Sequence, residues 1–111
     1  MFSFTYKNIT FTHYHDHGRL DIAFKHNKFI FNTHSKDLDI RTLEEFADII
    51  EPAIEASNRI DALNKVIFGL AKPDITQEDR ETLTVLERIK EEEHAKKTKA
   101  LHTIQNELNY F

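Results

Sequence analysis

The sequence predicts an α+β fold, in which an N-terminal three- to four-stranded antiparallel β-meander precedes a long C-terminal helical hairpin. Apolar residues alternate at every second position before residue 35 and recur every three or four positions after it. These are the periods of a half-buried strand and of an amphipathic helix. The chain has only two glycines and two prolines, so little of it is left for loops. Its 111 residues correspond to a single domain.

Two turn signals organise the sheet, which we expect over residues 1–35. His17-Gly18 and Asn27-Lys28 each separate alternating apolar runs, and glycine and asparagine tolerate the positive φ of two-residue hairpin turns. Turns at these pairs would place Phe11 opposite Phe24, and Phe24 opposite Phe31. The two turn predictions agree on a single apolar face of the sheet, which we predict to be buried. Its side chains are Ile9, Phe11, Leu20, Ile22, Phe24, Phe29 and Phe31.

The first six residues predict a fourth strand. Phe2, Phe4 and Tyr6 alternate, but the parity changes at Lys7-Asn8. We expect a third tight turn there, and a β-bulge is the alternative.

Two helices are expected, over residues 40–70 and 76–109. The sequence Thr42-Leu43-Glu44-Glu45 has the pattern of a capping box that opens the first helix, and Thr76 repeats this pattern before the second. Pro52 lies inside the first helical pattern. Proline costs about 3 kcal/mol in a helix interior, so we expect a kink or a break near Ile50–Glu51.

The second helix is apolar at both ends and polar between residues 87 and 100. It would span roughly 48 Å, about twice the length of the predicted strands. We therefore expect its C-terminal end to project beyond the sheet. Its apolar residues there have the spacing of a helix–helix seam, which predicts a homodimer or docking on the first helix. These oligomer-interface candidates are Leu101, Ile104, Leu108 and Phe111.

Composition excludes several classes of function. The formal net charge of −4 disfavours direct nucleic-acid binding, and no apolar run approaches the length of a membrane span. Without cysteine, disulfides and thiolate metal sites are excluded, and we expect a cytoplasmic protein. No phosphate-binding loop or nucleophile motif is present, so we expect no enzyme activity, no catalytic residues and no cofactor.

His13 and His15 form the one pattern that points to metal. An HxH pair on a strand puts two imidazoles on one face, as in many two-histidine metal sites. A Zn²⁺ site needs a third or fourth ligand, and Asp16 and His17 would have to fold back from the turn to provide it. We therefore predict no metal site, and a metal-binding protein that uses His13 and His15 remains an alternative.

An acidic stripe on the first helix is the strongest candidate for a partner-binding site. Residues 35–62 carry eight acidic and three basic side chains. Carboxylates at helical spacing can imitate a phosphate backbone and occupy a basic groove on a partner, although most such stripes are ordinary solvated faces. The stripe consists of Glu44, Asp48, Glu51 and Glu55.

These observations favour a small non-enzymatic protein-interaction module. The sharper hypothesis is a phage or mobile-element inhibitor that binds a host or defence nucleic-acid-processing enzyme through the acidic helix. The abundance of Phe, Ile, Asn, Lys and Tyr, which is typical of AT-rich genomes such as those of low-GC bacteria and their phages, agrees with it. The further alternative is a structural dimer that is built on the C-terminal helix.

Overall fold

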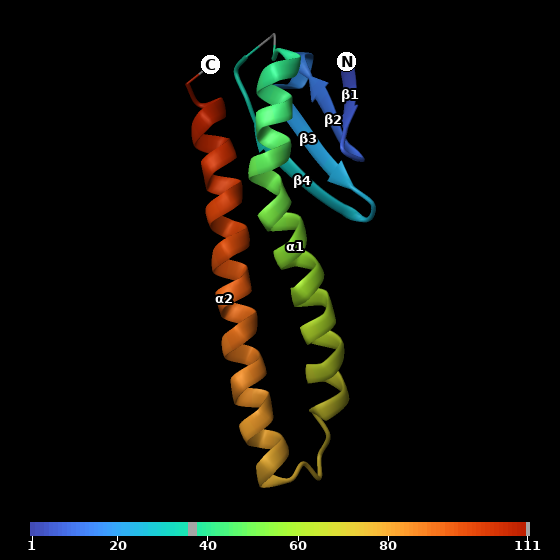
Figure 1. The fold of residues 1–111 in the computed structure, drawn as a ribbon, viewed down its shortest axis with the longest axis vertical. Helices are drawn as coiled ribbons and strands as arrows, with labels where there is room; N and C mark the ends of the chain where they lie inside the picture. Colours follow the sequence, from blue (N-terminus) through green and yellow to red (C-terminus); the bar gives the residue numbers. More distant parts are fainter. Residues whose placement is uncertain (36–37, 111) are drawn as a thin grey trace.

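The computed structural model of the protein describes residues 1–35 and 38–110, and it contains an antiparallel sheet followed by two long helices (Figure 1). The four strands lie in the order β1-β2-β3-β4, so each pairs with its neighbour in the chain. This architecture confirms the predicted fold class. The strands are β1 (Phe2–Tyr6), β2 (Ile9–Tyr14), β3 (Arg19–Phe24) and β4 (Asn27–Asn32), and the helices are α1 (Ile40–Leu70) and α2 (Gln77–Leu108).

The turn between β1 and β2 confirms the predicted fourth strand. Lys7 and Asn8 have φ angles of 52° and 65°. Positive φ at both central residues is the conformation of the type I′ turn, whose twist matches that of the flanking strands. Tyr6 consequently pairs with Ile9, and Phe4 pairs with Phe11.

The other two turns differ from the prediction in register but not in face. A short 3₁₀ helix, η1 (His15–His17), lengthens the connection from β2 to β3, so Phe11 pairs with Ile22 instead of Phe24. The next turn lies two residues earlier than expected, and Ile22 pairs with Phe29. Both displacements are even, and side chains alternate with a period of two, so the predicted core face stays intact.

Gly18 makes the longer β2–β3 connection possible. It follows η1 in the left-handed region with φ 61°, and a Cβ atom there would lie 3.1 Å from the carbonyl oxygen of Thr33. Glycine is the residue that meets both conditions without strain.

The core lies between the sheet and one end of the helix pair. The first half of α1 and the last turns of α2 cover the apolar sheet face. Phe11, Leu20 and Ile22 from the sheet are fully buried there, as are Leu43 and Ile50 from α1 and Ile104 and Leu108 from α2.

A side chain caps the start of each helix, but the cap of α1 lies at a different residue from the predicted one. Thr76 accepts a hydrogen bond from the backbone N–H of Asp79 at 3.1 Å, which confirms the predicted start of α2. In α1 the cap is Asp39, whose carboxylate accepts from the Thr42 N–H at 2.7 Å, so the capping box predicted at Thr42 is wrong by three residues. This hydrogen bond lowers the pKa of Asp39. Of the kink or break expected near Ile50–Glu51, the break is absent, because α1 continues through Pro52.

The helix pair extends well beyond the sheet on one side (Figure 1), and the molecule measures 56 × 23 × 23 Å. Every buried residue of α1 lies at or before Ile60, and every buried residue of α2 lies at or after Glu93. We call residues 61–92 the arm, and the sheet with the remaining helix segments the base. The prediction that the C-terminal end of the second helix projects is therefore wrong. The chain reverses between the helices, so that end returns to the sheet and the opposite end projects.

Candidate interaction surfaces

His13 and His15 do not share a solvent-exposed edge. His13 points to the core side of β2, is 3% exposed, and hydrogen-bonds through Nε2 to the carbonyl oxygen of Ser35 at 3.1 Å. His15 lies in η1, where it is exposed and 3.3 Å from a carboxylate oxygen of Asp16. Within residues 1–35 and 38–110, no three His, Asp or Glu side chains are arranged to hold a metal ion. The metal alternative thus has no third ligand in this part of the chain.

The acidic stripe lies on α1 beside the hairpin turns of the sheet. Asp48 accepts a hydrogen bond from Lys7 of the β1–β2 turn at 3.2 Å. This bond, together with the negative charge of Asp48, raises the pKa of Lys7. The sheet therefore supplies a cation to the middle of the stripe, which sequence spacing along one helix could not reveal.

The remaining members of the stripe also have cationic or apolar neighbours. Glu55 lies 3.7 Å from Arg59 on the next turn of α1. Glu51 and Glu55 line a groove of about 430 Å³ together with Lys7 and Lys25. Glu44 is half-buried. The four carboxylates follow one helix, but the surface around them is mixed in charge, and a basic groove on a partner would have to displace these lysines.

The predicted oligomer seam lies mostly inside the chain itself. Ile104 and Leu108 are 0% exposed because they pack against the sheet and α1, and Leu101 is half-buried beside them. Phe111 lies outside the described residues. Because Ile104 and Leu108 are already buried within one chain, these two side chains are not available to a second copy.

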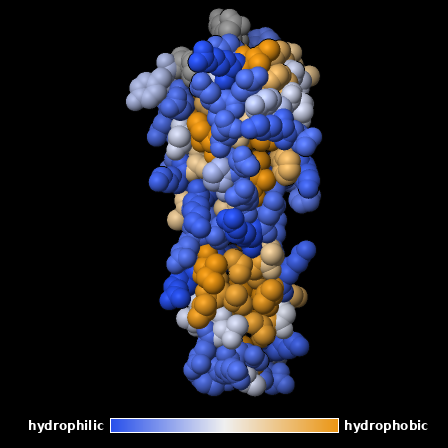
Figure 2. Space-filling model, in the orientation of Figure 1, coloured by the Kyte–Doolittle hydropathy of each residue, from blue (hydrophilic) through white to orange (hydrophobic). Residues whose placement is uncertain are grey.

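The arm carries an apolar surface that sequence analysis did not identify as a site. Figure 2 shows it as a contiguous hydrophobic area over the helix pair, away from the sheet. Ala62, Leu63 and Val66 of α1 and Ile89 of α2 line a groove of about 290 Å³, which Arg59 of α1 also lines, and we call the four apolar residues the distal surface. Val66 is 51% exposed. These residues have helical periodicity in the sequence, and that periodicity alone predicts that they are buried. Only the reversal of the chain between α1 and α2 shows that they lie away from the core.

The charge of the molecule is concentrated on the arm. Residues 61–92 carry eight acidic and five basic side chains, which is three of the four net negative charges. Most of the carboxylates belong to α2. The distal surface is thus an apolar groove within an acidic setting.

An ionic cluster, in which a buried carboxylate has two half-exposed cationic partners, separates the arm from the base. Glu93 is 6% exposed and lies 3.1 Å from both Arg59 and Lys96. Its pKa is lowered mainly by the hydrogen bond from Lys96 and further by the one from Arg59, against an opposing effect of burial. The cluster ties α1 to α2 at the level where the sheet ends.

Comparisons of the chain with models of protein families, with curated proteins and with solved structures found no match. Neither helix in the described part of the chain has the length and apolar character needed to cross a membrane.

Proposed function

We propose that this protein is a small non-enzymatic protein-interaction module, and that its arm binds a basic amphipathic helix of a partner protein. The observation that carries the proposal is the distal surface, where two helices present apolar side chains that no third element of the described chain covers. Contiguous exposed apolar surface of this kind is typical of protein-binding sites.

The shape of the arm favours a helical ligand. Two antiparallel helices bury only the side chains between them and leave a groove on each side. A third helix that lies in such a groove with its apolar face inward completes a bundle, as in helix-in-groove recognition. Burying one aliphatic side chain contributes about 1.5–3 kcal/mol, so covering the distal surface would give a useful affinity.

The charge of the arm favours a basic ligand over a second copy. Two arms would each bring a net charge of −3 into contact, whereas a basic helix would complement it. Proteins that act on nucleic acids carry basic surfaces, so a nucleic-acid-processing enzyme is the partner class that we propose. The acidic stripe on α1 would also attract a positively charged partner, although one of its carboxylates, Asp48, already pairs with Lys7.

The test compares two fluorescent amphipathic peptides that share one leucine stripe and differ only in having lysine or glutamate on the polar face. We expect the lysine peptide to bind, with an affinity that falls as salt rises, and the glutamate peptide not to bind. Val66→Asp should abolish binding. Ile40→Asp is the matched control, because Ile40 is 49% exposed but lies on the base.

Three outcomes would contradict the proposal: no binding of the lysine peptide, equal binding of both peptides, or equal binding to both variants. Sedimentation equilibrium of the free protein completes the test. A wild-type dimer that Val66→Asp dissociates would show that the distal surface receives a second copy instead of a basic helix.

A further inference from the structure

The outer edge of β4 is partly occupied by a side chain of α2. The amide group of Gln105 accepts a hydrogen bond from the Asn32 N–H at 3.1 Å and donates one to the Asn32 carbonyl oxygen at 2.8 Å. These are the two bonds that a neighbouring strand would make to this residue. β4 is the last strand of the sheet in residues 1–35 and 38–110, so beyond Gln105 its edge has no neighbouring strand from this part of the chain.

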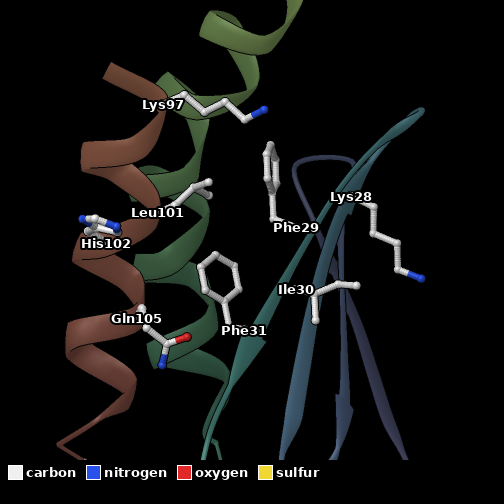
Figure 3. A pocket seen from close by; sticks show the side chains of 8 residues that line it. All are labelled: Lys28, Phe29, Ile30, Phe31, Lys97, Leu101, His102 and Gln105. Atoms are coloured by element: carbon white, nitrogen blue, oxygen red, sulfur yellow. The ribbon is translucent and has the colours of Figure 1, made fainter. Parts of the chain in front are cut away.

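The same edge continues unoccupied toward the start of β4. Backbone polar groups point alternately to the two sides of a strand, so Ile30 and Lys28 direct their N–H and C=O groups to the side on which Gln105 bonds to Asn32. A groove of about 390 Å³ runs there between β4 and α2, with Phe29 and Leu101 at its apolar floor (Figure 3). No other described residue bonds to the outward backbone groups of Ile30.

The charged side chains of this groove are cationic. Lys97 lies over the ring of Phe29 at 5.7 Å, and Lys28 stands on the other side of the strand (Figure 3). Asp21 approaches Lys28 at 3.3 Å, but it also pairs with Arg19 at 2.9 Å, so the trio keeps a positive charge. Among the described residues, no carboxylate lines the groove.

We propose that this groove binds an extended acidic segment of another protein, which adds to β4 as a short fifth strand beside Ile30. Main-chain hydrogen bonds to Ile30 would hold the segment, and Lys28 and Lys97 would select its acidic side chains. Gln105 ends the site at Asn32, which limits the added strand to a few residues. A second copy of this edge would bring lysine against lysine, so edge-to-edge dimerisation is disfavoured.

The site is independent of the distal surface, because it is built entirely on the base. The probe is a display library of random peptides about five residues long, which is close to the commonest strand length. We expect selection on the wild-type protein to enrich peptides with acidic residues among β-branched ones. Their affinity should fall in Lys28→Glu and Lys97→Glu and should be unchanged in Val66→Asp.

Ile30→Pro tests the main-chain contact. Because the Ile30 N–H points away from β3, proline removes a donor from the edge without removing a bond of the sheet. We expect Ile30→Pro to weaken binding of a selected peptide about tenfold, and the control Ile30→Val, which keeps the N–H, to bind as the wild type does.

N-methylation of the selected peptide keeps the test decisive even if Ile30→Pro folds poorly. A methyl group on each backbone nitrogen in turn should block binding at alternate positions only, because every second N–H of an added strand faces β4. Failure to enrich any peptide, indifference to the methylation pattern, or full binding to folded Ile30→Pro would overturn the proposal. Loss of binding in Val66→Asp would place the peptide on the arm and would also overturn it.

Discussion

Glu93 shows how a single residue defines a boundary within this fold. Its carboxylate is buried where the sheet ends, and its two cationic partners come from different helices: Arg59 from α1 and Lys96 from α2. A buried charge that loses a partner is strongly destabilising, whereas the intact cluster satisfies its members. Glu93 is therefore positioned to favour one alignment of the two helices over others.

This role predicts a pH dependence for stability. The pKa of Glu93 lies below its ordinary value of 4.5 in the folded protein, so the folded state binds its proton less readily than the unfolded state does. The stability that this group contributes is present above pH 4.5 and is lost as the pH falls through the lowered pKa. We expect Glu93→Gln to be less stable than the wild type near neutral pH, and the difference to shrink in acid.

Urea denaturation at a series of pH values measures this difference. Glu92→Gln is the matched control, because its side chain is exposed on the same turn of α2. If Glu93→Gln and Glu92→Gln have the same pH profile, the cluster at Glu93 does not contribute as proposed.

At the scale of elements, sequence patterns predicted each strand and helix but not their registers. The alternation of Phe11, Ile22 and Phe29 determines which face is buried, and an even shift in a turn leaves that face unchanged. The register itself depends on turn conformation. The tight turn at Lys7-Asn8 was correctly predicted, whereas the 3₁₀ turn at His15–His17 has no comparable signal.

The same limit applies to the helices. Thr76 was correctly predicted as a cap because it directly precedes the apolar pattern of α2. Periodicity shows that a helix has an apolar face, but it does not show what covers that face. Leu108 and Leu83 have equivalent patterns at opposite ends of α2, and only the three-dimensional structure distinguishes core from surface.

Leucine-to-alanine substitutions at the two ends of α2 test this distinction. Leu108→Ala should reduce the free energy of unfolding by about 2–5 kcal/mol, because it opens a cavity in the core of the base. Leu83→Ala, the same change on the half-buried surface of the arm, should cost clearly less. Chemical denaturation at two protein concentrations measures both effects. Equal losses of unfolding free energy in the two variants would contradict this distinction. A denaturation midpoint for Leu108→Ala that depends on protein concentration would show that Leu108 lies at an interface between chains.

At the scale of the whole molecule, the base holds the core and the arm holds the proposed binding surface. Among the described residues, the hydrophobic core joins the sheet to α1 as far as Ile54 and to α2 from Ala100 onward, and no residue of the arm belongs to it. The acidic stripe and the β4 groove also lie on the base. Of the candidate surfaces, only the distal one depends on the arm.

This division predicts that the arm can be shortened. A variant in which a glycine-rich turn replaces residues 65–87 should fold with a melting temperature close to that of the wild type, because it retains Arg59 and Glu93 and every core residue. It should no longer bind the lysine peptide, and it should still bind peptides selected for the β4 groove. Circular dichroism and fluorescence anisotropy measure these properties. Unfolding of the shortened variant would show that the arm stabilises the base.

Because the arm lies beyond the core, we expect each helix to unfold locally in the arm without unfolding in the base. Near the reversal of the chain, each helix is supported only by the other, and opening there exposes little buried apolar surface. Amide hydrogens at the tip should therefore exchange through local fraying, whereas those beside Ile50 and Ile104 exchange only when the entire base unfolds. A ligand that covers the distal surface would slow this fraying, so part of its binding free energy would be spent on ordering the arm.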